Sequence, residues 1–138
     1  MDREIKVLIV DGQHRSRQSL QALLATWPDV AAIREAANGI EAQRLAEEYL
    51  PDLFLIDVRM TEMGWLETIQ RIKDRWPDTG VVVLSMYNDF EPSAMAAGAD
   101  AFVTKGEPPE VLLSILEAVA ESREQHPKAA RCSNGETL

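Results

Sequence analysis

The stretch that decides the fold reads Asp52-Leu53-Phe54-Leu55-Ile56-Asp57-Val58-Arg59-Met60. It follows a proline, Pro51, and its apolar run ends abruptly in the carboxylate of Asp57. A short continuous apolar run bounded by turn signals is typical of a fully buried strand in a parallel sheet. Ligands of open α/β sheets bind just beyond the carboxyl ends of the strands. The stretch therefore places Asp57 where a functional site is expected.

Strand and helix patterns alternate on both sides of this stretch. Apolar runs predict four further strands, and helical spacing predicts five helices. The strands are expected at residues 5–10, 30–36, 81–84 and 101–104, and the helices around residues 20–27, 42–49, 66–76, 91–98 and 111–119. This alternation predicts an α/β fold in which a single five-stranded parallel sheet is covered by helices on both faces.

The helical pattern is lost near Glu124, where Gln125, His126 and Pro127 interrupt it. We therefore expect one domain over residues 1–123, followed by a tail or the start of a linker over residues 124–138. The total length of 138 residues fits a single hydrophobic core.

Composition excludes several classes of protein. A net charge of -9 argues against nucleic-acid binding by this chain alone, because phosphate contacts need a basic face. It does not exclude a DNA-binding domain in a longer product. The single cysteine, Cys132, gives no disulfide framework and favours a reducing compartment. No signal peptide and no run of about 20 apolar residues is seen, so we expect a cytoplasmic protein without a membrane span.

Polar residues stand at the ends of four predicted strands. They are Asp11, Asp57, Ser85 and Lys105. In a parallel sheet these ends lie on one edge, so the side chains are candidates to converge. Two carboxylates, a hydroxyl and an ammonium suit phosphoryl transfer, with a carboxylate as nucleophile and the lysine or a divalent cation neutralising charge. Magnesium typically uses one or two carboxylates together with waters and phosphate oxygens.

In these stretches the chain resembles the receiver domain of two-component response regulators. The matching segments are Val7–Asp11, Pro51–Met60, Val81–Ser85 and Gly98–Gly106, in order at the expected strand ends. The likeness extends over about residues 3–122. It implies the flavodoxin-like strand order 2-1-3-4-5, and it is strongest to receivers that carry a helix-turn-helix DNA-binding output domain.

The resemblance implies a role for each residue of the site. Asp57 would accept a phosphoryl group from a sensor histidine kinase in a phosphorelay. Lys105 would pair with the acyl phosphate, and Ser85 would swing to hydrogen-bond it. Phe102 occupies the position of the switch aromatic residue, although simple core packing explains it equally well. Magnesium would be held by Asp11, Asp57 and the backbone carbonyl of Arg59.

The resemblance also implies how the signal leaves the domain. Phosphorylation would alter the face formed by the fourth helix, fifth strand and fifth helix, and so switch transcription through an output domain, a partner or a homodimer. The terminal helices are an alternative dimer contact. The domain would be no enzyme, beyond catalysing its own phosphoryl transfer and dephosphorylation.

One departure from the family concerns the metal site. The family usually has two adjacent acids after the first strand, and here they are Asp11 and Gly12. Alignment on Arg17 puts Gly12 at the position of the direct magnesium ligand and Asp11 at the position that reaches the metal through water. Loss of such a ligand should weaken magnesium binding by roughly 10–100-fold or more. Asp11, Asp57 and Lys105 then sum to about -1, so we expect Lys105 to pair directly with Asp57.

The loop after Asp57 departs as well. It reads Met60-Thr61-Glu62-Met63-Gly64-Trp65 and lacks the proline common in the family. Gly64 stands where an aspartate would cap the third helix, and Trp65 replaces a glycine and is expected to pack on the loop or be partly exposed. Glu62 is a candidate substitute carboxylate. These changes support an alternative hypothesis, a phosphate-independent pseudo-receiver that acts as a protein-interaction module.

Overall fold

Five parallel strands form the centre of the structure, a computed structural model that describes residues 4–58 and 64–124. The strands are β1 (Ile5–Val10), β2 (Val30–Ala36), β3 (Leu53–Asp57), β4 (Gly80–Ser85) and β5 (Ala101–Thr104). Their order in the sheet is β2-β1-β3-β4-β5, with every neighbouring pair parallel. The predicted fold class and strand order are both confirmed.

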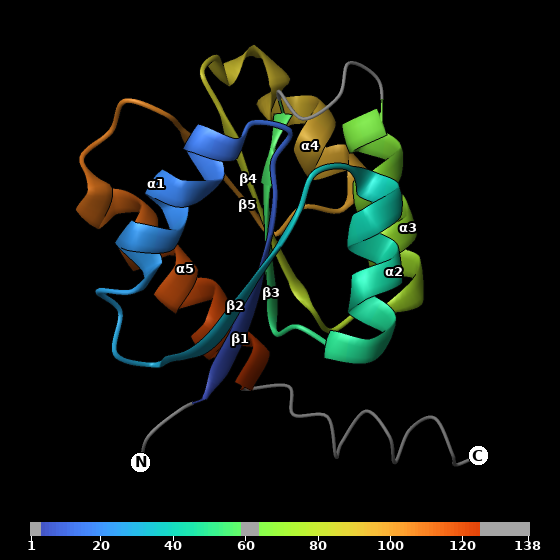
Figure 1. Ribbon diagram of the computed structural model, residues 1–138. Coiled ribbons are helices and arrows are strands. Elements are labelled where there is room, and N and C mark those ends of the chain that lie inside the picture. The colour runs from blue at the N-terminus through green and yellow to red at the C-terminus, as the bar shows by residue number, and fades with distance from the viewer. Residues whose placement is uncertain (1–3, 59–63, 125–138) are drawn as a thin grey trace.

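Helices cover both faces of the sheet (Figure 1). They are α1 (His14–Leu24), α2 (Gly39–Tyr49), α3 (Gly64–Arg75), α4 (Glu91–Ala97) and α5 (Pro109–Glu124), and a short 3-10 turn, η2 (Asn88–Phe90), precedes α4. α1 and α5 pack on one face, and α2, α3 and α4 pack on the other. None of the helices in the described part of the chain is long and apolar enough to cross a membrane.

The central strand explains why residues 53–57 decide the fold. Phe54 and Ile56 are fully buried beneath α2, α3 and α4, whereas Leu53 and Leu55 are fully buried beneath α1 and α5. Because both faces are covered, the strand needs apolar residues at every position rather than at alternate ones. Burial of each large apolar side chain contributes about 1.5–3 kcal/mol to stability.

One helix end differs from the sequence prediction, and another agrees with it. α1 ends at Leu24, although the apolar spacing extended to Trp27. Trp27 is still buried, but its N–H bonds to the carbonyl of Leu24 three residues back, in a turn. Pro28 disfavours helical geometry at the residue before it, which explains the early end. α4 stops before Gly98, as predicted, because Gly98 adopts a left-handed φ of 115°.

The helices α2 and α4 begin in different ways. Asn38 is the N-cap of α2, where its side chain accepts the N–H of Glu41 at 2.9 Å. Phe90, the last residue of η2, precedes α4, and no side-chain cap is formed there.

Candidate functional site

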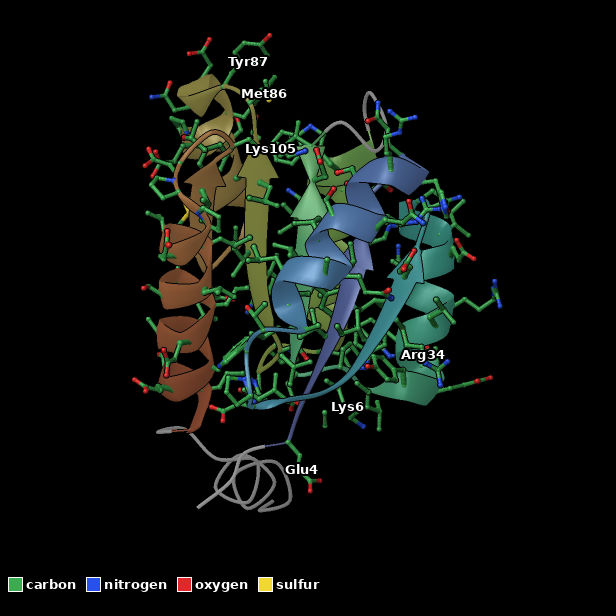
Figure 2. All side chains as sticks on the ribbon, turned by 60° about the vertical axis from the view of Figure 1, so that its left-hand side comes forward. Glu4, Lys6, Arg34, Met86, Tyr87 and Lys105 are labelled. Atoms are coloured by element: carbon green, nitrogen blue, oxygen red, sulfur yellow. The ribbon has the colours of Figure 1, made fainter. Side chains whose placement is uncertain are left out.

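The strand ends bring four polar residues to one edge of the sheet. Asp57 and Ser85 are the last residues of β3 and β4, and Asp11 and Lys105 directly follow β1 and β5. Since β1, β3, β4 and β5 are consecutive in the sheet, these side chains leave adjacent strands on the same edge. Figure 2 shows Lys105 at this upper edge, with Glu4 at the opposite end of the molecule.

Asp57 and Lys105 form an ion pair at the centre of the site. The Nζ atom of Lys105 donates a hydrogen bond to Oδ2 of Asp57. The Asp57 side chain is completely buried, and that of Lys105 is 19% exposed. A buried carboxylate is costly unless it is paired, so Lys105 acts as its internal counterion. The direct pair expected from the charge count is present.

Asp11 is the second buried carboxylate of the site. Its Oδ1 atom accepts the backbone N–H of Gln13 at 2.9 Å, whereas Oδ2 has no hydrogen-bond partner among the residues that the structure describes. Burial raises the pKa of Asp11, and the negative charge of Asp57 adds to this. The Ser16 hydroxyl and the Gln13 N–H offset it only in part. The ionised form of Asp11 therefore lowers the stability of the folded protein.

Arg17 fixes the backbone that carries Asp11. Its Nη1 atom donates to the carbonyl oxygen of Asp11 at 2.7 Å, and its Nε atom pairs with Glu35 at 2.9 Å. Gly12 is exposed and brings no carboxylate to the site. The carbonyl of Arg59 and the side chain of Glu62, both candidates from the sequence, lie outside the described residues.

Replacement of Asp11 by asparagine is expected to stabilise the metal-free protein at pH 7 by about 1 kcal/mol. The pKa of Asp11 is higher in the folded protein than in the unfolded chain. The stability that this difference provides is fully present below the unfolded pKa and is lost as the pH rises through the folded pKa. The advantage of Asp11→Asn should thus shrink as pH falls toward about 4. Urea unfolding in EDTA measures it. Asp74→Asn, an exposed acid, is the control. An equal gain at every pH would contradict burial as the cause.

The donor set fits a magnesium ion with few protein ligands. The unpartnered Oδ2 of Asp11 offers a buried oxygen beside the carboxylate of Asp57. Magnesium is often bound by one or two carboxylates and several waters, which matches this pair. Within the described residues, however, no group of three or more His, Cys, Asp or Glu side chains could hold a metal. Two carboxylates are present where the family has three.

Ser85 is held by the segment that follows it. Its side chain is buried, and its Oγ accepts the backbone N–H of Tyr87 at 3.1 Å. Its carbonyl oxygen accepts the N–H of Lys105 at 2.7 Å, which ties the ends of β4 and β5 together. Phe102 is partly buried against the core on the side of α2, α3 and α4. That position is compatible with core packing and with the switch role alike.

One contact near the site was missed from the sequence. Trp65 is only 4% exposed, and its ring packs edge-on against that of Phe90, with 5.7 Å between centroids and 80° between planes. The tryptophan is therefore packed rather than partly exposed. Phe90 lies in a segment that the sequence presented only as a loop. The one available signal was a large aromatic residue where the family has glycine.

Residues 7–117 match the family model described as the response regulator receiver domain. The chain is 40% identical over 111 residues to YhcZ of Bacillus subtilis (strain 168), an uncharacterized transcriptional regulatory protein, covering 79% of this chain and 52% of that protein. It is 34% identical over 116 residues to the nitrate/nitrite response regulator protein NarL of Escherichia coli (strain K12), covering 83% and 54%.

A solved structure shows the same architecture. The crystal structure of a two-component response regulator of the LuxR family from Aurantimonas sp. SI85-9A1 superposes with a TM-score of 0.81 at 28% identity. The match covers 87% of each chain. The present chain spans about half the length of the curated relatives that it matches.

Proposed function

We propose, because this chain belongs to the response regulator receiver domain family, that it is a signalling domain switched by phosphorylation of Asp57. The donor would be a phosphohistidine of a sensor histidine kinase. The observation that carries the proposal is the buried carboxylate of Asp57 at the end of β3, bonded to Lys105 from β5.

The residues of the site suit transfer to a carboxylate. An oxygen of Asp57 attacks phosphorus, an O–P bond forms, the P–N bond to histidine breaks, and the histidine nitrogen takes up a proton. Lys105 leaves the carboxylate oxygen and pairs with the phosphoryl oxygens, so its charge stays in the site throughout. A magnesium ion bound by Asp11 and Asp57 would supply further neutralisation of the transferring group. The domain thereby catalyses only its own phosphorylation and hydrolysis.

The output is proposed from the relatives. Two of them are named as a transcriptional regulatory protein and a response regulator, which supports a role in transcription through a DNA-binding domain in a longer product. The surface of α4, β5 and α5 would carry the change to that domain or to a second copy, with the terminal helices as the alternative dimer contact. We place the domain in the cytoplasm with its kinase.

A second function, a phosphate-independent interaction module, is favoured by a specific observation. The site carries only one uncompensated carboxylate without a metal, since Lys105 already pairs with Asp57 and Gly12 supplies no third carboxylate. Such a site is stable when empty and has less need of a cation than a site with three acids.

Intact-mass measurement separates the two functions. Incubation with magnesium and acetyl phosphate is expected to add one phosphoryl group to the wild-type protein and none to Asp57→Asn. Asp52→Asn is the matched control, since Asp52 lies just before the opposite end of β3 and should leave phosphorylation intact. No added mass at any magnesium concentration, with a competent receiver domain run alongside, would overturn the first function in favour of the second.

A further inference from the structure

The segment between β4 and α4 is held at both of its ends. At its start, the N–H of Tyr87 bonds to Oγ of Ser85 at 3.1 Å. At its end, the ring of Phe90 packs edge-on against Trp65. Between these points Met86 and Tyr87 are 52% and 64% exposed, and Figure 2 shows both projecting above Lys105. The segment is therefore fixed by two contacts rather than by burial.

The two contacts involve the end of β4 and the start of α3, the helix that follows β3 in the chain. Ser85 is the end of β4, the strand beside β3. Trp65 lies on the first turn of α3, eight residues after Asp57 in the chain, and only 4% of it is exposed. Phe90, which is 37% exposed, contacts Trp65 and ends the segment that begins at Ser85. A change in the position of Ser85 must then be absorbed within residues 86–89 or transmitted to the Phe90–Trp65 contact.

We infer that Trp65 is a positioning residue of the phosphorylation switch, and that its contact with Phe90 restrains the β4–α4 segment and so opposes movement of Ser85 toward a phosphoryl group on Asp57. This inference rests on the proposed function. The restraint stabilises the resting arrangement, so its removal should favour the arrangement that binds the phosphoryl group. Edge-to-face aromatic contacts are weak enough to be broken by such a switch.

Binding of beryllofluoride, a stable mimic of the phosphoryl group, tests the restraint. We expect Trp65→Leu and Phe90→Leu each to raise its affinity in the presence of magnesium by roughly 2–10-fold, as the strength of one aromatic contact implies. The double variant should gain no more than either single variant, because both remove the same contact. Trp27→Leu is the matched control, since Trp27 is equally buried but packs on the opposite face of the sheet. It should leave the affinity unchanged.

A merely structural role for Trp65 gives different results. Loss of fold stability alone would affect Trp27→Leu as much as Trp65→Leu, and independent roles would make the effects of Trp65→Leu and Phe90→Leu additive. Either outcome overturns the inference.

A second readout is the fluorescence emission of Trp65 as the only tryptophan, in a Trp27→Phe/Trp76→Phe background. It should change when beryllofluoride binds, and Ser85→Ala should remove that change while bound fluoride is still seen by fluorine NMR.

Failure of the proposed function is distinguishable from failure of this inference. If no variant binds beryllofluoride and Asp57 takes no phosphoryl group, the function fails, yet the restraint is still testable in the resting protein. Amide hydrogen exchange at residues 86–90 should then be about tenfold faster in Trp65→Leu than in Trp27→Leu. Equal exchange in the two variants would show that Trp65 does not hold the segment.

Discussion

Replacing Gly12 by aspartate is expected to tighten magnesium binding by about 10–100-fold. The resting site has two carboxylates, Asp11 and Asp57, and Lys105 already neutralises one of them. A third carboxylate would add a direct ligand and make the empty site more negative, so a divalent cation gains both an oxygen and a stronger field. The described glycines with positive φ are Gly98 and Gly106, so the backbone conformation at Gly12 does not itself require glycine.

Magnesium titration by calorimetry measures this change, and acetyl-phosphate transfer should become saturated at correspondingly lower magnesium. Gln13→Asp is the matched control, because it adds the same charge one residue further on, at the N-cap of α1. It should strengthen binding much less than Gly12→Asp. An unchanged titration of Gly12→Asp would show that position 12 does not face the metal.

Replacing Lys105 by methionine is expected to destabilise the protein by about 3 kcal/mol at pH 7. The change removes the ammonium that pairs with the buried carboxylate of Asp57 and leaves that carboxylate beside Asp11, so two like charges lie close together in a buried site. Adding Asp57→Asn to Lys105→Met should restore most of the loss, because the buried negative charge of Asp57 is then gone. Urea unfolding of the two single variants and the double variant gives the coupling directly.

The control for this experiment is a second lysine whose ion pair is more exposed. Lys73 pairs with Asp100 at 3.0 Å, with side chains 21% and 39% exposed. Lys73→Met should cost less than Lys105→Met, because Asp100, the carboxylate left behind, is 39% exposed and is screened by water. A loss for Lys105→Met as small as that for Lys73→Met would contradict the assignment of Lys105 as the counterion of Asp57.

The sequence predicted the sheet and the four strand-end residues well, for a physical reason. A parallel sheet buried on both faces needs continuous apolar runs, so strands such as Leu53–Asp57 stand out. Once the strands are placed, parallel pairing alone brings Asp57, Ser85 and Lys105 to one edge. The pair between Lys105 and Asp57 followed from charge counting, without any knowledge of distances.

Contacts between side chains of different helices and loops could not be predicted in the same way. The pairing of Trp65 with Phe90 depends on how α3 is rotated and on the path of the chain after β4, and neither leaves a periodic signal in the sequence. Pro28 is a sequence signal for the early end of α1. The apolar spacing nevertheless continues to Trp27, because a residue in a turn can be buried just as a residue in a helix can. The roles of Ser85 and Phe102 as moving parts remain predictions.

The packing of helices on both faces of the sheet would give the proposed switch a direction. Trp65, Phe90 and α4 lie with α2 and α3 on one side of the sheet, while α1 and α5 pack on the other through a separate apolar cluster. In the proposed switch, a rearrangement passed from Ser85 to Phe90 would act first on the side that carries α4. It would reach α5 only through the end of β5, which the bond from the N–H of Lys105 to the carbonyl of Ser85 joins to β4. A partner that docks on the α1 side would recognise the domain in both states, and one that docks near Tyr87 and Phe90 would read which state it is in.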